Sequence, residues 1–305
     1  MKFRFSPLVY ALTCALVFGA ACTRAQAMST TRAGVAVLDL GETETGQRTA
    51  DELSAALARV PHFALVNRAQ SRAAARGVGY TGSLNLTLEE ARSLGASIGC
   101  DFYFTGEAQT LRRTSTSRPD YFESYASVFL ISAETGRLVL WEHFNSEAAA
   151  AGEAEKSLLA SLRVRAMHYA QTIEQAQAAE GSERLTLRAR EGAGAFEELP
   201  EEGSPAALNF RAPQPYRSLR PPYPATAARA AVEATVDALV SVDAAGEVKD
   251  IEIVRWAGYG LNEAVTATVR QLHFRPAMRD GQAVPVRVLL RYNFRRPAEE
   301  TRGKG

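Results

Sequence analysis

Histidine, cysteine and acidic residues, the usual carriers of catalysis and metal binding, show no combined pattern in this sequence of 305 residues. Its histidines are His62, His143, His168 and His273. None of them has the spacing to another histidine, to cysteine or to an acidic residue that zinc sites show. Asp120 and Glu123 lie in a segment with strand character, and their odd spacing makes the two side chains point to opposite faces. We interpret them as separate solvated charges rather than as an acid and base pair.

The letters of Gly77–Gly82, GVGYTG, match those of a dinucleotide-binding glycine loop. That loop needs a strand before it and a helix N-terminus directly after it. Here a helical segment rich in Arg and Ala precedes the glycines, and SLNLT follows them, so we interpret the motif as an ordinary loop. The sequence also has no phosphate loop and no zinc spacing. It therefore predicts a protein that is not an enzyme and that has no cofactor and no metal.

Cys100 is the sole cysteine outside the N-terminal segment, and it precedes a stretch, DFYF, that is typical of a buried strand. An unpaired cysteine in such a position is expected to be a small core residue rather than a reactive thiol.

The chemistry that the sequence does indicate is that of an exposed backbone near the end of the chain. From Val284 to Phe294 apolar residues occupy alternate positions, which is typical of a strand with one face in a core and the other in water. Pro285 lacks an N–H and is tolerated at a strand start or edge. An edge strand can bind a second strand through its main chain.

Within this strand we expect two sets of side chains, one facing the core and one facing solvent. The inward set is Val286, Val288, Leu290 and Tyr292, and the outward set is Arg287, Leu289 and Arg291. The outward arginines would guard the edge against aggregation and favour an acidic or polar peptide. The alternative is that this strand is a guarded edge and nothing more.

A small domain over residues 221–297 must position this strand, followed by a polar tail at 298–305. Tyr223-Pro224 opens a short helix, residues 235–255 form a hairpin around Gly246, and a second helix begins near Leu261. The turn pair Asp280-Gly281 precedes the closing strand. The sequence predicts two helices on a three-stranded antiparallel sheet, which is too small for a cofactor pocket.

The first folded region, residues 34–178, alternates buried strands and amphipathic helices and then has a hairpin with a turn at Ala133–Gly136. Thr87 followed by Glu90 is the signature of a capping box at a helix start. This order predicts an α/β domain with a mixed sheet, so the whole chain is expected to be α+β. Residues 180–220 are rich in Glu, Arg, Gly and Pro without a sustained period, and we interpret them as a linker.

The first 27 residues have the layout of an export signal, in which Lys2 and Arg4 precede an apolar run and Ala25-Gln26-Ala27 is a small-x-small cleavage site. Two alternatives stay open. The apolar run could remain as an anchor, although a span needs about 20 apolar residues, and Cys22 could be lipidated. All three alternatives place most of the chain in the periplasm or cell envelope. Membrane attachment would then occur through the N-terminal segment or through Cys22.

Charge is nearly balanced, with a net charge of +1 and 23% charged residues, so no overall field indicates nucleic acid as a partner. From Leu208 to the end, fifteen Lys or Arg and ten Asp or Glu give a net charge of +5. This mildly basic region is compatible with an acidic peptide partner.

The order of motifs in residues 221–297 resembles the C-terminal domain of TonB-family energy transducers. The resemblance is carried by Tyr223, Pro224, Ala228, Val236, Gly246, Gly258, Leu261, Phe274, Pro276, Ala277, Gly281 and Phe294, of which Tyr223, Pro224, Gly246, Phe274, Pro276 and Gly281 form the family motif. It implies a domain that binds outer-membrane receptors by pairing its last strand with a short receptor segment, the TonB box. The candidate partner-binding residues that it implies are Val284, Val286, Arg287, Val288, Leu289, Leu290, Arg291, Tyr292 and Phe294. Transport across the envelope is the process in which such a domain acts.

Three departures bear on what the resemblance implies. Ala234 stands where the family usually has Gly, Leu272-His273 replaces a step that often holds Trp, and Arg220-Pro221-Pro222 replaces a Gln-Pro stretch. The N-terminal apolar run also has no His, and the long Pro-rich spacer is replaced by a folded region. Receptor-type binding is therefore expected, whereas coupling to an ExbB–ExbD motor is in doubt.

Residues 34–178 resemble the periplasmic α/β domain of TolB and of CsgG-like and LpoB-like envelope proteins. The matching pieces are VAVLDL, FALVNRAQ, LGASIGCDFYFTGEA and SAETGRLVLWE. This resemblance implies a binding or assembly module. The expected partners are an outer-membrane receptor or other envelope proteins, and the alternative function is that of a non-transducing envelope scaffold.

Overall fold

The structure is a computed structural model, and it describes residues 32–61, 63–114, 120–190, 196–201 and 203–296. The predicted export signal and the polar tail at 298–305 lie outside the described residues. Residues 32–305 form one compact unit. No helix in the described ranges is both long and apolar enough to cross a membrane.

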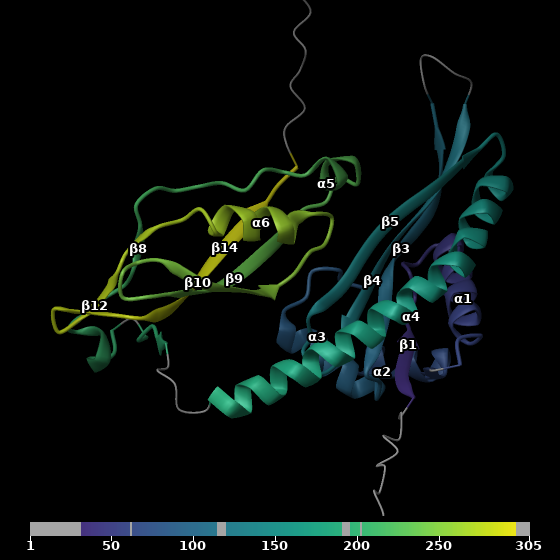
Figure 1. Cartoon of the computed structure of the whole chain (residues 1–305). Helices are drawn as coiled ribbons and strands as arrows, with labels where there is room; N and C mark the ends of the chain where they lie inside the picture. The colour runs from purple at the N-terminus through teal and green to yellow at the C-terminus, as the bar shows by residue number, and fades with distance from the viewer. Residues whose placement is uncertain (1–31, 62, 115–119, 191–195, 202, 297–305) are drawn as a thin grey trace, which may run out of the picture. The chain divides into compact units, whose positions relative to one another are not determined.

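The first region contains a five-stranded mixed sheet in the order β2-β1-β3-β4-β5 (Figure 1). Strands β2, β1 and β3 are parallel, and β3, β4 and β5 are antiparallel. The predicted mixed sheet is therefore confirmed. Its strands are β1 (Ala33–Val37), β2 (Phe63–Leu65), β3 (Phe102–Arg113), β4 (Tyr121–Ser132) and β5 (Leu138–Ala148).

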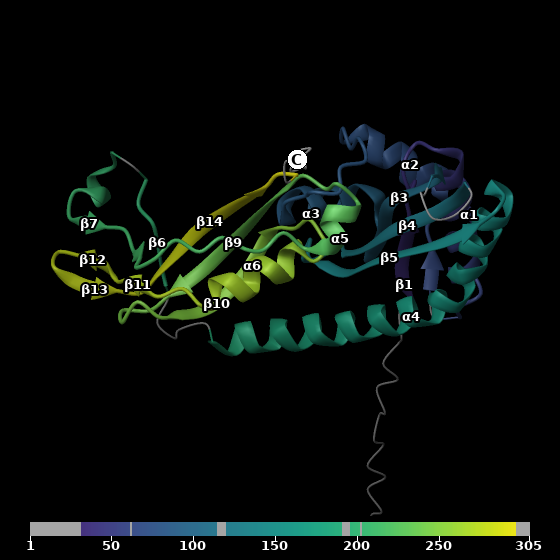
Figure 2. The same cartoon turned by 90° about the horizontal axis from the view of Figure 1, so that it is seen from above.

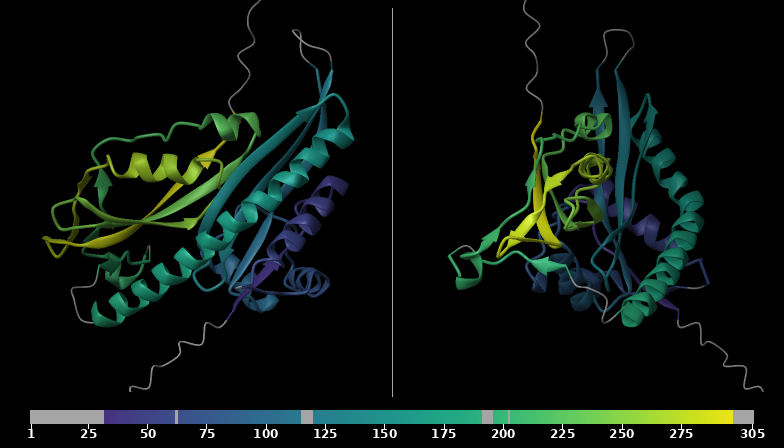
Figure 3. Two further views of the ribbon diagram at one scale, coloured as in Figure 1. Left: turned by 45° about the vertical axis from the view of Figure 1, so that its right-hand side comes forward. Right: turned by 60° about the vertical axis from the view of Figure 1, so that its left-hand side comes forward.

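Four helices accompany this sheet: α1 (Glu44–Leu57), α2 (Arg68–Gly77), α3 (Leu88–Ile98) and α4 (Ala151–Arg190). The predicted capping box is confirmed at α3, because the Thr87 hydroxyl accepts from the Glu90 N–H and the Glu90 carboxylate accepts from the Thr87 N–H. Helices α1 and α4 lie together on one face of the sheet (Figure 3). They bury leucines and aromatic rings against β3 and β4, which gives this region its core.

The C-terminal region has the predicted two helices, α5 (Ala225–Arg229) and α6 (Leu261–Val269). Helix α6 packs along one face of a second sheet, ordered β10-β9-β14-β6 (Figure 2). Its three long strands are antiparallel, and the combination of this sheet with the first region confirms the α+β class. The strands are β6 (Glu197–Glu198), β9 (Ala234–Val242), β10 (Val248–Arg255) and β14 (Val286–Phe294).

The segment predicted as a linker contains regular structure. Helix α4 continues to Arg190, and β6, η1 (Pro205–Ala207), β7 (Phe210–Arg211) and β8 (Gln214–Pro215) follow. Strand β6 joins the second sheet, β7 pairs with β12, and β8 pairs with β11. The remaining strands are β11 (Phe274–Arg275), β12 (Ala277–Arg279) and β13 (Gln282–Val284).

Polar contacts explain why α4 is longer than its apolar period predicts. Its last turns hold Glu180 and Glu183, which bind Thr135 (3.1 Å) and Arg137 (2.6 Å) beside the β4–β5 turn. Arg184 adds an ion pair with Glu134. A helix end held by charged groups shows no hydrophobic period, so its continuation was not visible in the sequence.

One hydrophobic cluster includes residues from both predicted domains. Trp256 contacts the first region, because its ring lies tilted against that of Phe129, with 6.0 Å between the ring centroids, and its indole Nε1–H donates to the Gly136 carbonyl at 2.9 Å. Asn85 donates to the carbonyls of Thr235 (2.8 Å) and Trp256 (2.7 Å). The compact unit of residues 32–305 therefore includes direct contacts between its α/β part and its C-terminal part.

The family-motif residues stabilise the fold of the C-terminal region. Gly246 adopts a left-handed φ of +86° in the β9–β10 turn, and a Cβ at this position would lie 1.9 Å from the Phe274 carbonyl oxygen. The Phe274 N–H donates to the Gly246 carbonyl at 2.9 Å, so the two motif residues form one contact. Tyr223 donates from its hydroxyl to the Val232 carbonyl at 2.5 Å and packs near the Phe294 ring.

The predicted turn at Asp280-Gly281 is confirmed as the tip of the β12–β13 hairpin. Both residues have positive φ, 49° and 81°, which is the requirement of a type I′ turn. In contrast to Gly246, Gly281 has no atoms near the position of an added Cβ.

Replacing Gly246 with alanine tests this contact. We expect Gly246→Ala to lower the free energy of unfolding by about 3 kcal/mol or more, because backbone strain adds to a clash with a carbonyl. Gly281→Ala is the matched control, with positive φ and open space, and should cost about 1 kcal/mol. Urea denaturation measures both, and equal losses would contradict the close approach of Gly246 to Phe274.

Limited proteolysis tests the predicted division of the chain. Cleavage within Glu198–Pro205 is expected to leave two folded pieces, because this stretch has no periodic apolar face and lies outside the long strands. Mass spectrometry of a protease time course would identify them as stable fragments on either side of the cut. Simultaneous degradation of both halves would contradict the proposed division.

Candidate partner-binding edge

Strand β14 has the alternation that the sequence predicts. Val286 and Phe294 are buried, Val288, Leu290 and Tyr292 are half-buried, and the residues between them are exposed. The side chains of the inward set contact the same core as α6. On one side the whole strand pairs antiparallel with β9, from Val286 opposite Val242 to Phe294 opposite Ala234.

The opposite side of β14 is where backbone groups remain open. Successive residues of a strand direct their N–H and C=O groups to opposite sides. The Glu197 N–H donates to the Pro285 carbonyl at 2.9 Å, which assigns the odd-numbered residues to the side away from β9. Leu289, Arg291 and Asn293 therefore direct their backbone groups to this side. Among the described residues, no strand pairs with β14 there beyond Arg287.

The start of this edge is already paired. Val286 and Arg287 lie opposite Glu197 and Glu198 of β6, which runs parallel to β14. Val284 differs from the prediction, because it lies in β13 opposite Ala277. Pro285, with no N–H, separates the two strands. We call the segment Val288–Phe294, which has no strand on this side in the described chain, the open edge of β14.

The two outward arginines of β14 differ in how closely each is bound to an acidic side chain. Arg291 binds Asp237 through two hydrogen bonds of 2.8 and 3.0 Å, and the Asp237 side chain is 4% exposed. Arg255 approaches the same carboxylate at 3.4 Å. Arg287 is half exposed, and its nearest acidic oxygen, on Glu198, is 3.9 Å away, which makes a long and weak ion pair. Arg291 is therefore committed to the sheet, and Arg287 is the outward arginine with the weaker partner.

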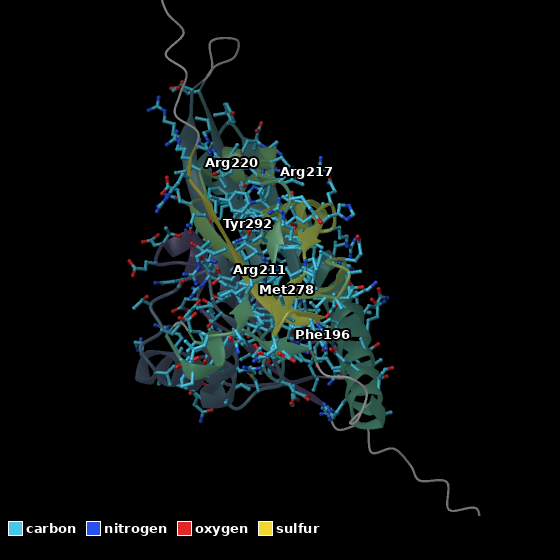
Figure 4. The ribbon with its side chains drawn as sticks, turned by 90° about the vertical axis from the view of Figure 1, so that its left-hand side faces the viewer. Phe196, Arg211, Arg217, Arg220, Met278 and Tyr292 are labelled. Atoms are coloured by element: carbon cyan, nitrogen blue, oxygen red, sulfur yellow. The ribbon has the colours of Figure 1, made fainter. Side chains whose placement is uncertain are left out.

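Other exposed arginines lie in the C-terminal region. Figure 4 shows Tyr292 on β14 with Arg217 and Arg220 to one side along the strand, and with Arg211, Met278 and Phe196 toward the other end. The three labelled arginines are exposed and form no ion pair with any acidic side chain in the part of the chain that the structure describes. We call Arg211, Arg217 and Arg220 the flanking arginines.

A cavity of about 360 Å³ lies beside β7, β8, β11 and β12. Arg211, Tyr216, Arg275 and Met278 are among its lining residues. The Arg275 guanidinium lies 5.8 Å from the centre of the Tyr216 ring, and the Tyr216 side chain is exposed. The lining of this cavity therefore combines cationic groups with exposed aromatic and thioether surface.

The remaining chemical candidates of the sequence have structural roles. His143 Nδ1 lies 2.9 Å from Ser127 Oγ, and burial lowers the pKa of His143. His273 lies 3.1 Å from a Glu247 carboxylate oxygen on the surface. Cys100 is half-buried, and burial raises its pKa to about 12. It is therefore a protonated thiol at neutral pH.

Neither metal ligands nor a nucleotide loop come together in the described ranges of the chain. No group of three or more His, Cys, Asp or Glu residues there could hold a metal ion. Gly77 ends α2 and the next helix begins only at Leu88, so Gly77–Gly82 is a loop without the strand and helix that a nucleotide site needs. Asp120 and Glu123 bind different arginines, Arg112 and Arg113.

Comparison with known families gives a match in this region. Residues 220–295 match the family model described as the Gram-negative bacterial TonB protein C-terminal. The match includes α5, α6 and β9 to β14, and it confirms the resemblance that the sequence motifs predict. No curated protein matches the sequence.

Solved structures similar to the chain show low identity and low TM-scores. The C-terminal domain of TonB from Pseudomonas aeruginosa is 18% identical, covers 33% of this chain and 95% of its own, and has a TM-score of 0.25. The LpoB C-terminal domain from Salmonella enterica is 15% identical, covers 39% and 85%, and has a TM-score of 0.27. The hypothetical protein CT253 from Chlamydia trachomatis is 12% identical, covers 44% and 95%, and has a TM-score of 0.33. At these scores the likenesses support no argument about function.

The buried carboxylate of Asp237 gives a test of the sheet beneath the edge. Asp237→Ala removes the acceptor of two charge-assisted hydrogen bonds, and we expect a loss of about 1–3 kcal/mol in the free energy of unfolding. Asp250→Ala is the control, because Asp250 is an exposed carboxylate on the neighbouring strand β10 and should change stability by about 0.5 kcal/mol or less. Chemical denaturation measures the free energy of unfolding of both variants. Equal losses in Asp237→Ala and Asp250→Ala would show that Asp237 does not anchor Arg291.

Proposed function

We propose that this protein binds partner proteins of the cell envelope by accepting a strand on the open edge of β14. The observation that supports this most is the unpaired backbone of Leu289, Arg291 and Asn293 within the residues that match the TonB C-terminal model. An extended peptide placed there would form main-chain hydrogen bonds, while alternate side chains would determine specificity. The side-chain alternation holds the strand to its core whether or not a partner is bound.

The partner proposed is an outer-membrane receptor or transport component that presents an acidic, extended segment. The flanking arginines are free of described acidic partners, and complementary charge favours encounter and register of an acidic strand. This replaces the expectation that Arg291 would contact the peptide, because Arg291 is bound to Asp237. A periplasmic location follows from the same proposal, since receptor segments of this kind face the periplasm.

Exposed backbone on an edge strand also has a simpler interpretation, as an edge that is only guarded against aggregation. Charged side chains at alternate positions of β14 are compatible with that interpretation. The two interpretations differ in whether a peptide binds, so a titration separates them.

NMR titration with a TonB-box-like peptide is the test. We expect the amide signals of Leu289, Arg291 and Asn293 to shift most, because their N–H groups point to the open edge. Shifts confined to amides elsewhere in the chain would contradict strand addition.

Two proline variants sharpen the titration. Leu289→Pro removes an N–H that points to the open edge and should abolish peptide binding while the fold persists, since proline is tolerated at such a position. Leu290→Pro removes an N–H that points to β9, and we expect it to unfold or severely destabilise the sheet. Unchanged peptide affinity in a folded Leu289→Pro protein would overturn the proposal.

A pulldown from envelope extracts with the full chain separates the receptor function from the alternative of an assembly scaffold. Recovery of outer-membrane receptors, lost in Leu289→Pro, is the expected result. Recovery of other envelope proteins that are retained by Leu289→Pro would favour the scaffold.

A further inference from the structure

The first residues of the β14 edge are covered by a segment of the chain itself. Phe196–Leu199 comes directly before Pro200, and its β6 residues lie opposite Val286 and Arg287. This pairing is parallel, and the Glu197 N–H donates to the Pro285 carbonyl at 2.9 Å. A strand is therefore already added to β14 within the molecule, by a segment about 90 residues away in sequence.

Charge and apolar contacts fix this segment in place. The Glu197 carboxylate accepts from Arg279 Nε at 2.8 Å, and the same guanidinium lies over the Phe210 ring at 5.1 Å. Glu198 lies 3.9 Å from Arg287. Leu199 packs against the hydrophobic cluster of the C-terminal region. The segment thus has the features expected of a partner strand, which are backbone pairing, acidic side chains against arginines and an apolar anchor.

The pairing is limited to the start of β14. Strand β6 covers two residues of β14, and no strand of the described chain pairs with that side of Val288–Phe294. Such a short strand, held by half-exposed ion pairs, is easily displaced.

We propose that Phe196–Leu199 is an internal competitor that occupies the start of the β14 edge and is displaced when a partner strand pairs along its full length. This inference rests on the proposed function. A tethered segment competes at a high effective concentration, so a weak strand can still reduce the apparent affinity for a partner. The partner binds the fraction of molecules in which the segment has left the edge.

Two proline variants separate the backbone pairing from the charge. Glu197→Pro removes the N–H that donates to Pro285, whereas Glu198→Pro leaves it intact because the Glu198 N–H points away from β14. Each variant removes one carboxylate. In hydrogen exchange of the full chain without any peptide, we expect the Arg287 amide to exchange about tenfold faster in Glu197→Pro and to change little in Glu198→Pro. Unchanged protection of the amides of Val288, Leu290 and Tyr292 would verify that the sheet remains folded.

Titration of the same proteins with the TonB-box-like peptide tests the competition. We expect Glu197→Pro to bind it about threefold more tightly than the wild type or more, and Glu198→Pro to bind it within about twofold of the wild type. Equal or weaker binding by Glu197→Pro, with a faster Arg287 amide, would overturn the competitor and leave the proposed function intact. A peptide that shifts no edge amide in any of the proteins would refute the proposed function, and the competition with it, although the exchange result would still stand.

Discussion

The hydrogen-bond ladder between β9 and β14 is the interaction on which the candidate site depends. It uses the backbone N–H and C=O groups of alternate β14 residues between Val286 and Phe294, and the groups of the residues between them face no strand beyond Arg287 in the described chain. A backbone N–H or C=O away from water needs a partner. The open side can therefore stay unpaired only because it faces solvent, and it is then free to accept a strand.

Packing around this ladder holds the edge in a fixed position. Alternate β14 side chains enter the core beneath α6, and the buried Asp237 holds Arg291 and Arg255 on the outer face. The turn at Gly246 brings Phe274 against β9 and β10, which orders the segment that leads into β14. A strand fixed on both faces and along one side loses little further freedom when a second strand pairs with it, and such preorganisation favours binding.

Local patterns in the sequence predicted much of this arrangement. The alternation along β14, the capping box at Thr87 and the turn at Asp280-Gly281 each depend on residues close in sequence, and each was predicted correctly. The motif around Tyr223, Gly246 and Phe274 lies within the residues that match the model of the TonB C-terminal family, as the resemblance predicted. The candidate edge itself stays a prediction, since its function depends on a partner.

Long-range contacts were not predictable from these patterns. Nothing in the sequence of Phe196–Leu199 indicates that Glu197 pairs with a strand about 90 residues later. Strand β6 has two residues, which are too few to show a hydrophobic period. The bond between Asp237 and Arg291 joins two strands whose register appears only after folding, so no sequence pattern indicates that Arg291 binds a carboxylate within the sheet. The extension of α4 depends on ion pairs with the β4–β5 turn and was likewise hidden.

Hydrogen exchange along β14, measured residue by residue in the free protein and with a partner peptide, tests the central claim most directly. The account predicts a two-residue alternation in the free protein, with slow exchange at Val288, Leu290 and Tyr292 and fast exchange at Leu289, Arg291 and Asn293. Addition of the partner peptide should slow amide exchange at Leu289, Arg291 and Asn293 and leave the other three residues unchanged. Strong protection of Leu289, Arg291 and Asn293 in the free protein would contradict the account, because it would mean that the edge is already closed.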